Sequence, residues 1–319
     1  MKPEPKSLQE AIIYFADPDN CINYLAVRRW PKGVVCPTCG SDSVKFNASR
    51  RIWQCASHHA KRQFSIKVGT IFEDSAIGLD KWLTATWMLT NCKNGISSYE
   101  IARDVKVTQK TAWFMMHRIR LAVQDESFGK LGGDGKHIEV DETFIGAKAR
   151  NIHKNKRTHK LGMANKAMVL GVLERGGNIR ARVAKDRSAS AVCDIVREHV
   201  VPETKVFTDK LLSYKELEGD YVREVIDHAE GYVRGQVHTN GLENFWSLLK
   251  RGLHGTYVSV EPFHLFRYLD EQVFRFNHRA TKKNKVTDAD RFNLAISKIV
   301  GKRLTFAQLT GKLAETAAF

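Results

Sequence analysis

The apolar residues of this chain change their spacing near residue 137, from a helical period to the two-residue period of β-strands. Strands are expected at 137–145, 167–174 and 179–184, and the turn Arg175-Gly176-Gly177-Asn178 joins the last two. A helix at 188–200, a strand at 204–208 and a helix that begins near residue 240 follow. This order of strand, hairpin, helix, strand and helix predicts an α/β domain over residues 131–280.

Three acidic residues are placed on these expected elements. Asp141 lies in the middle of the first strand, Asp209 ends an apolar run, and Glu243 lies near the start of a helix. Hard divalent cations prefer oxygen ligands and keep waters for a reaction. Two such ions stabilise both the attacking and the leaving oxygen of a phosphodiester. Because the element order is that of an RNase H-like domain, the sequence predicts a Mg²⁺ (or Mn²⁺) phosphoryl-transfer site at these three carboxylates.

The helix with Glu243 carries two further candidates. Lys250 lies seven residues after Glu243, nearly two helical turns, so both side chains leave the same face. Glu243 is then expected to reach a metal ion while Lys250 contacts a DNA phosphate. Asn240, one turn earlier, is a rival or additional oxygen ligand. The adjoining apolar stripe, which would seat the helix on the sheet, consists of Leu242, Phe245, Trp246, Leu249 and Leu253.

The charge of the chain indicates a polyanionic partner. The chain has 51 Lys and Arg residues and 35 Asp and Glu residues, which give a net charge of +16 and a pI near 9.6. Nucleic acid is the commonest partner of such a basic protein. No acidic residue occurs between Glu142 and Glu174. In that segment Lys154, Lys156 and Arg157 are expected to contact backbone phosphates of double-stranded DNA. The alternative is a solvated basic loop.

Residues 1–75 are expected to hold two short helices and a small zinc ribbon. Cys36 and Cys39 form one knuckle, and Cys55 begins a second one after fifteen residues. Thiolates and an imidazole at this separation suit tetrahedral Zn²⁺ in a structural site. The fourth ligand is His58 or His59, and we assign it to His58. The alternative is a degenerate site with stray thiols.

Residues 76–130 show a helix-turn-helix pattern. A capping box at 97–100 opens the first helix, and a short turn leads to a second helix that Thr108 can cap. The first turn of this second helix is expected to face base edges or phosphates of DNA with Thr108, Gln109, Lys110 and Thr111. The alternative is a packing subdomain. Residues 281–319 are expected to form a helical tail.

No run of about 18 apolar residues, the length of a membrane span, occurs in the chain. The polar residues 1–6 lack the apolar core of a signal peptide. We therefore expect a cytoplasmic protein without a membrane partner. Thiols stay reduced in that compartment, so its clustered cysteines are expected to bind metal.

The sequence resembles the bacterial insertion-sequence transposases of the ISXO-like group, which join a zinc ribbon, a helix-turn-helix and a DDE-type RNase H-like domain. The motifs that carry this resemblance run from near residue 20 to near 280 and comprise 28–31 (RRWP), 36–40 (CPTCG), 64–72 (FSIKVGTIF), 110–113 (KTAW), 140–143 (VDET), 237–251 (VHTNGLENFWSLLKR) and 275–279 (RFNHR). One departure is His58, because the last ribbon ligand of this group is typically cysteine.

The resemblance implies a magnesium-dependent transposase with Asp141, Asp209 and the turn Asn240/Glu243 in its active site. Members have either Glu or Asn as the third ligand. Such an enzyme binds the terminal inverted repeats of its element, cleaves DNA and joins the 3′ ends to target DNA. It is expected to self-associate and to lie on the bacterial nucleoid when bound to DNA. The alternatives are an RNase H-like nuclease without strand transfer and a catalytically inert DNA-binding regulator.

Overall fold

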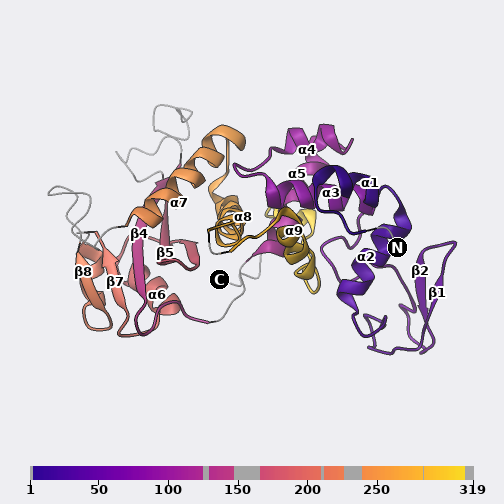
Figure 1. The fold of residues 1–319 in the computed structure, drawn as a ribbon, viewed down its shortest axis with the longest axis horizontal. Helices are drawn as coiled ribbons and strands as arrows, with labels where there is room; N and C mark the ends of the chain where they lie inside the picture. Colours follow the sequence, from indigo (N-terminus) through magenta and orange to yellow (C-terminus); the bar gives the residue numbers. More distant parts are fainter. Residues whose placement is uncertain are drawn as a thin grey trace. The chain divides into compact units, whose positions relative to one another are not determined.

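The computed structural model describes residues 3–124, 129–146, 166–209, 212–225, 239–282 and 284–312. The chain forms two compact units (Figure 1). Unit 1 combines Met1–Gln124 with His278–Phe319, and unit 2 is Asp125–Asn277. The segment after residue 280, which the sequence suggested as a tail of its own, therefore belongs to the unit that contains the N-terminal elements.

Unit 2 is built on a five-stranded sheet in the order β6-β5-β4-β7-β8. Its strands are β4 (His137–Ile145), β5 (Ala167–Glu174), β6 (Ile179–Val183), β7 (Lys205–Thr208) and β8 (Val222–Val225). β4, β5 and β6 pair antiparallel, whereas β7 runs parallel to β4 and β8 runs parallel to β7. The sequence predicted the first four strands but not β8, a short edge strand in which two valines flank two charged residues.

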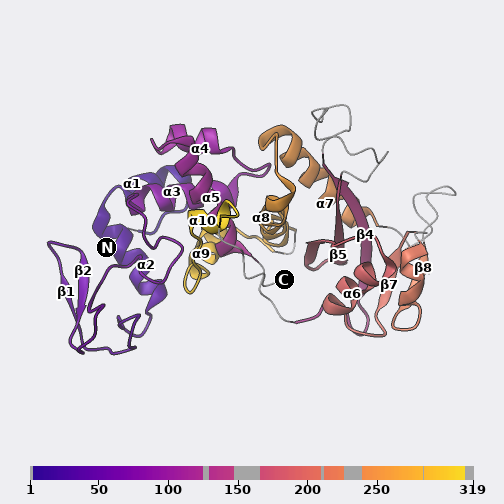
Figure 2. The ribbon, with the colours of Figure 1, turned by 180° about the vertical axis from the view of Figure 1, so that it is seen from behind.

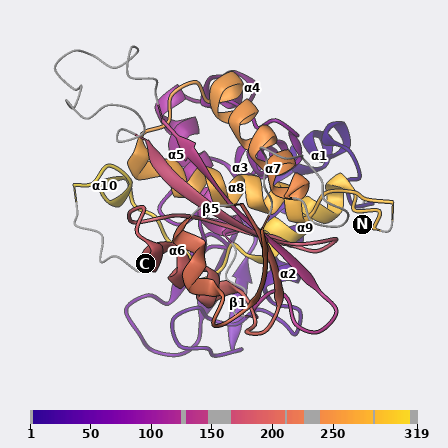
Figure 3. The same ribbon diagram turned by 90° about the vertical axis from the view of Figure 1, so that its left-hand side faces the viewer.

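Helices cover both faces of this sheet (Figure 3). On one face lie α6 (Ala189–His199) and the 3₁₀ helix η4 (Leu212–Leu217), over a core that includes Ile138, Val140, Leu170 and Val192. On the other face lie α7 (Asn240–Arg251) and α8 (Leu265–Asn277), over a core that includes Val169, Leu173, Leu242 and Leu269. The short helices η5 (Gly252–Thr256, a π-helix) and η6 (Pro262–His264) connect α7 to α8. Because it is covered on both faces, β5 is an almost continuous apolar run.

Unit 1 contains a small three-stranded sheet and a group of helices. The sheet is antiparallel in the order β1-β2-β3. The elements in chain order are α1 (Leu8–Phe15), α2 (Pro18–Arg29), β1 (Val44–Asn47), β2 (Ile52–Cys55), β3 (Gln63–Phe64), α3 (Leu79–Asn91), α4 (Ser98–Asp104), α5 (Gln109–Val123), α9 (Asp288–Ser297) and α10 (Phe306–Leu309). In Figure 2, α9 and α10 lie against α3 and α5.

The C-terminal segment completes the core of unit 1. Phe292 of α9 packs among the rings of Phe15, Tyr24 and Trp87. Arg118 of α5 is 3% exposed and donates hydrogen bonds to the main-chain oxygens of Leu304 at 3.0 Å and Glu73 at 2.6 Å. These contacts join residues that are far apart in the sequence into one unit.

Among the helices of the described residues, none has the length and apolar character needed to cross a membrane.

Candidate active site and metal centre

Asp141 and Glu142 are neighbours on the central strand β4, and their side chains leave opposite faces of the sheet. On the α7 face, Asp141 Oδ2 accepts a hydrogen bond from the indole N–H of Trp246 at 2.9 Å. On the α6 face, Glu142 Oε2 accepts one from the hydroxyl of Tyr214 at 2.5 Å. A buried aromatic side chain therefore orients each carboxylate.

Asp209 follows directly after β7 and completes a group of three carboxylates. The parallel pairing of β4 with β7 matches Glu139 with Phe207, so Asp209 follows the paired strand at the level of Asp141. One oxygen each of Asp141, Glu142 and Asp209 lies within 4.8 Å of the others. The guanidinium of Arg223 on β8 donates to Thr208 Oγ1 at 2.9 Å and to the main-chain oxygen of Asp209 at 3.2 Å. The neighbouring edge strand thus fixes the end of β7.

Burial and neighbouring negative charges disfavour the charged forms of Asp141 and Glu142. The pKa of Asp141 is raised to about 6, first by burial and then by the charges of Asp209 and Glu243, against the hydrogen bond from Trp246. The pKa of Glu142 is raised to about 7 by burial and by the charges of Asp209 and Asp141, against the hydrogen bond from Tyr214. A divalent cation at this place would offset the repulsion.

The predicted residues on α7 lie beside this group. The buried side of α7 consists of Leu242, Phe245, Trp246 and Leu249, which is the stripe expected from the sequence, and Leu253 in η5 continues it. Glu243, Asn240 and Lys250 are exposed. Glu243 is not one of the three gathered carboxylates, although its charge contributes to the raised pKa of Asp141.

Sequence reasoning missed Glu142. The alternation of side chains along a strand places Glu142 on the face opposite Asp141, which argues against a shared site. The position of Asp209 just past the end of β7 allows it to lie near both. Trp246, which the pattern indicates as a core residue, is buried but also supplies the hydrogen bond to Asp141.

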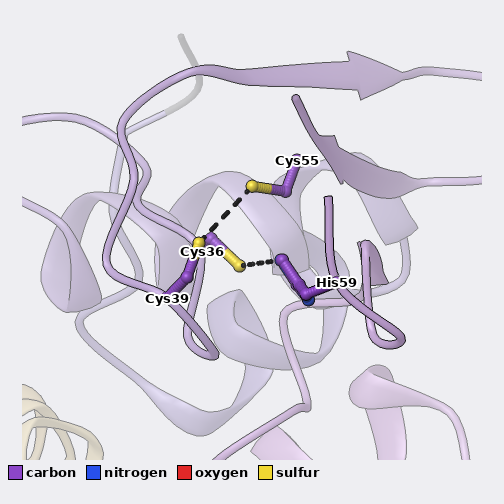
Figure 4. A group of neighbouring side chains, drawn as sticks. All are labelled: Cys36, Cys39, Cys55 and His59. Carbon is purple, nitrogen blue, oxygen red and sulfur yellow. Dashed lines mark hydrogen bonds between the residues drawn. The ribbon is translucent and has the colours of Figure 1, made fainter. Parts of the chain in front are cut away.

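A second group of metal-ligating side chains lies in the small sheet of unit 1 (Figure 4). Cys36 Sγ is 3.5 Å from His59 Nε2, and Cys39 Sγ is 3.6 Å from Cys55 Sγ. Gly40 takes a positive φ of 75°, which closes the turn after the first knuckle. Three sulfurs and one imidazole nitrogen within reach of one another form the donor set of a structural zinc site.

The fourth member of this group is His59 and not the predicted His58, so we propose His59 as the fourth ligand. His59 is partly buried and contacts Cys36, whereas His58 is exposed in the turn that follows β2. Burial alone would raise the pKa of the Cys55 thiol. Hydrogen bonds involving His59, Ser57 and Cys39 outweigh burial and lower this pKa to about 6, which favours the zinc-binding thiolate.

The residues predicted to read DNA lie at the start of α5. Ser97 and Glu100 form the expected capping box of α4, and the Thr108 side chain accepts a hydrogen bond from Thr111 N. The Gln109 side chain donates to Ser98 Oγ at 2.8 Å, and the Lys110 amino group lies 4.7 Å from the ring centre of Phe306. Thr108 and Lys110 are exposed. The predicted phosphate contacts Lys154, Lys156 and Arg157 lie outside the described residues.

Comparisons with known proteins identify the class of protein. Residues 130–277 match the ISXO2-like transposase domain, and residues 17–60 match a transposase zinc-ribbon domain. The chain is 28% identical over 253 residues to a Halobacterium salinarum protein named "Uncharacterized protein in transposable element ISH50", with 75% of this chain and 84% of that protein covered. It is 30% identical over 101 residues to an "Uncharacterized transposase-like protein" of Haemophilus influenzae, with 31% and 81% covered.

The chain belongs to the family of ISXO2-like transposases. This family is one of DNA-modifying enzymes. The two matched regions divide between the units described above, since the zinc-ribbon match lies in unit 1 and the transposase match in unit 2. The three cysteines of the ribbon group lie inside the zinc-ribbon match, and so does His59, which supports zinc as its metal.

Proposed function

We propose that this protein binds the terminal inverted repeats of its insertion sequence, cleaves DNA and joins the freed 3′ ends to target DNA. The observation that carries the proposal is the group of Asp141, Glu142 and Asp209 on adjacent strands. This group lies inside the region that matches the transposase domain. The net charge of +16 suits a DNA partner.

We infer an RNase H-like fold for unit 2. Three strands that pair antiparallel, followed after a helix by two strands parallel to the first, give the sheet order β6-β5-β4-β7-β8. This order matches the succession of elements from which the sequence suggested such a domain. In this order β4 and β7 are neighbours, and the two proposed catalytic aspartates are Asp141 on β4 and Asp209 directly after β7.

The donor set of this site fits hard divalent cations. Every gathered atom is a carboxylate oxygen, which Mg²⁺ and Mn²⁺ prefer. We propose Asp141, Asp209 and Glu243 as the ligands, with Asn240 as the rival of Glu243 and Glu142 as a further carboxylate. When bound, a pair of such ions lowers the pKa of a water and stabilises charge on the leaving oxygen.

The side chains around the site have separate roles in this proposal. Trp246 and Tyr214 fix one oxygen each of Asp141 and Glu142, which sets the direction of the remaining carboxylate oxygens before DNA binds. Arg223 fixes the main chain at Asp209. Lys250, exposed two turns along α7 from Glu243, contacts a phosphate of the bound DNA.

The reaction proceeds in two displacements at phosphorus. In the first, a water oxygen bonds to a phosphorus at the end of the element, and the bond from that phosphorus to the 3′ oxygen breaks. In the second, the freed 3′ hydroxyl attacks a phosphorus of target DNA and displaces another 3′ oxygen. Each displacement breaks one phosphodiester bond, and no covalent protein–DNA intermediate forms.

We also propose that α4 and α5 form a helix-turn-helix that contacts DNA. Thr108 and Lys110 are exposed at the start of α5, and Thr111 lies one turn along. The segment with Lys154, Lys156 and Arg157 is proposed to contact backbone phosphates. Replacing these three residues by Gln should weaken DNA binding and reduce its salt dependence without changing sequence preference.

A strand-joining assay tests the proposal. The purified protein is incubated with Mg²⁺, a labelled fragment that carries the flanking inverted repeat, and a plasmid target. Joined product from the wild type, but not from Asp141→Ala, supports the transposase. Cleavage without joining would indicate a nuclease, and binding with neither activity would indicate an inert regulator. Joining that survives Glu243→Gln would move the third ligand from Glu243 to Asn240 or Glu142.

A further inference from the structure

The first turn of α7 has an unusual cap. The side chain of the N-cap residue Thr239 makes no capping hydrogen bond. The N–H of Leu242, which such a cap would normally satisfy, donates instead to Glu139 Oε2 at 3.1 Å. Glu139 belongs to β4, so a carboxylate of the central strand caps the helix that carries Asn240 and Glu243.

Both carboxylate oxygens of Glu139 accept hydrogen bonds, one from Leu242 on α7 and one from Arg175 in the turn that follows β5. Its residue is 1% exposed, and Oε1 accepts a hydrogen bond from Arg175 Nε at 2.9 Å. The guanidinium of Arg175 lies 4.2 Å from the ring centre of Phe207 on β7. A buried carboxylate is tolerated only with such partners, and a negative charge at a helix N-terminus is stabilised by the helix dipole.

The backbones of helix and sheet approach closely at this point. A Cβ on Gly241 would lie 2.7 Å from Glu139 Oε2 and 2.4 Å from Leu173 Cδ2. A Cβ on Gly171, the residue paired with Asp141 across the sheet, would lie 2.7 Å from both Leu242 Cδ2 and Trp246 Cζ2. Glycine at these two positions therefore lets α7 rest directly on β4 and β5.

Two hydrogen bonds attach α7 to β4, and the distance between them along the strand is close to the distance between them along the helix. Glu139 binds Leu242, and Asp141 binds Trp246. Two residues along a strand span about 7 Å, and four residues along a helix rise about 6 Å. Glu243 lies between the two attached positions of α7, so fixing both attachments fixes its Cα relative to Asp141.

We propose that Glu139 is a positioning residue of the active site. It holds the first turn of α7 on β4 and thereby sets where Glu243 and Asn240 stand relative to Asp141 and Asp209. This inference rests on the proposed function, because its catalytic readout is DNA cleavage.

The test compares Glu139→Gln, Glu139→Asp and Glu139→Leu in the full-length protein. Gln retains a side-chain oxygen that accepts the hydrogen bond from Leu242 N. Asp moves this acceptor away from α7 because its side chain is shorter, and Leu has no acceptor. Single-turnover cleavage at saturating DNA and Mg²⁺ should fall about tenfold to a hundredfold in the Leu variant, since misplacement by about 1 Å costs that much. The Asp variant should be intermediate and the Gln variant within about threefold of wild type. The Kd for DNA should not change.

The matched control is Glu174→Leu. Glu174 also accepts a main-chain hydrogen bond, from Gly132 N at 3.0 Å. It follows Leu173 on β5, so its side chain leaves the face of the sheet opposite α7. A second readout is independent of catalysis, namely amide hydrogen exchange in residues 239–246. Exchange there should become faster in Glu139→Leu and Glu139→Asp than in Glu174→Leu.

Two results would overturn the inference. One is a wild-type cleavage rate per folded molecule in Glu139→Asp or Glu139→Leu. The other is unchanged exchange of residues 239–246 in both. A wild-type protein that does not cleave DNA would instead overturn the proposed function, and the exchange measurement would still decide whether Glu139 holds α7.

Discussion

The two metal-binding groups of this chain are assembled in different ways. The ribbon group draws Cys36, Cys39, Cys55 and His59 from one short stretch around a three-stranded sheet. The acidic group draws its carboxylates from β4 and from the end of β7, with α7 beside them, across residues 141–243. The first group lies at a small sheet whose buried apolar side chains include Trp53 and Phe64. Two packed helical layers support the second group.

From this difference we expect the ribbon group to depend on its metal for folding and the acidic group to be folded before metal binds. Structural zinc contributes folding free energy directly, because a small ribbon buries too little apolar surface by itself. At the acidic site, Trp246, Tyr214 and Arg223 hold the carboxylates through hydrogen bonds that the sheet and helices already supply. Metal removal should therefore unfold the ribbon and leave unit 2 folded.

The largest expected effect is on catalysis, in Asp141→Asn and Asp209→Asn. Each removes the charge of a proposed oxygen ligand, so DNA cleavage should fall by about a hundredfold to a thousandfold or more. The zinc content of both variants should equal that of the wild type, because the ribbon group does not include these aspartates. The measurement is single-turnover cleavage beside Glu224→Gln, a partly exposed glutamate of the same sheet that pairs with Lys205. Equal rates in Asp141→Asn and Glu224→Gln would contradict the assignment.

The next effect is on zinc, in His59→Ala against His58→Ala. His59 contacts Cys36, so its loss removes a ligand and should weaken zinc binding by more than about a hundredfold. His58→Ala should keep the zinc. Native mass spectrometry of both variants, with a competing chelator, measures the retained metal. Loss of zinc from His58→Ala alone would restore the assignment made from the sequence.

A smaller effect is expected on the stability of unit 1, in Arg118→Met. This change removes two charge-assisted hydrogen bonds to main-chain oxygens, and should lower the free energy of unfolding by about 2–3 kcal/mol. Arg103→Met is the control, because the Arg103 side chain is 74% exposed. Urea denaturation of the two variants measures the difference. Equal stabilities would argue against the role of residues 300–305 in holding unit 1 together.

The smallest effect is on the pH dependence of stability without divalent cations in the buffer. The pKa of Asp141 is about 6 against an ordinary 3.8, and that of Glu142 about 7 against 4.5. Between the ordinary and the raised values, the folded state binds more protons than the unfolded state. The free energy of unfolding therefore decreases as pH rises from about 4 to about 7.

Thermal melting of the wild type and of the double variant Asp141→Asn, Glu142→Gln at pH 5 and pH 8 measures this slope. The double variant should lose less stability than the wild type between these pH values. Added Mg²⁺ should stabilise the wild type at pH 8 and have little effect at pH 5, where Asp141 and Glu142 are mostly protonated. The same pH slope in both proteins would contradict the raised pKa values.

Local patterns predicted much of unit 2. Strands β4 to β7 and the buried stripe of α7 follow from the spacing of apolar residues, which each element imposes through its own period. The edge strand β8 escaped prediction because its four residues are half polar and depend on pairing with β7. The position of Asp209 next to Asp141 follows only once the parallel pairing of β4 with β7 is known.

The remaining features depend on side-chain directions and long-range packing. The ribbon spacing admits either His58 or His59, and the geometry of the turn after β2 favours His59, which lies beside Cys36. Glu142 joins the acidic group against the alternation rule because Asp209 lies beyond the end of β7. No local pattern indicates that Phe292 packs among Phe15, Tyr24 and Trp87, since the sequence separation is too large.

The central claim is that the carboxylates on β4 and β7 hold the catalytic cations while the ribbon holds zinc. Electron paramagnetic resonance of a Mn²⁺ titration tests it directly, with the zinc content measured on the same samples. The wild type should remove Mn²⁺ from the free pool, and the double variant Asp141→Asn, Asp209→Asn should leave it free with its zinc retained. Equal Mn²⁺ binding by both proteins would contradict the account.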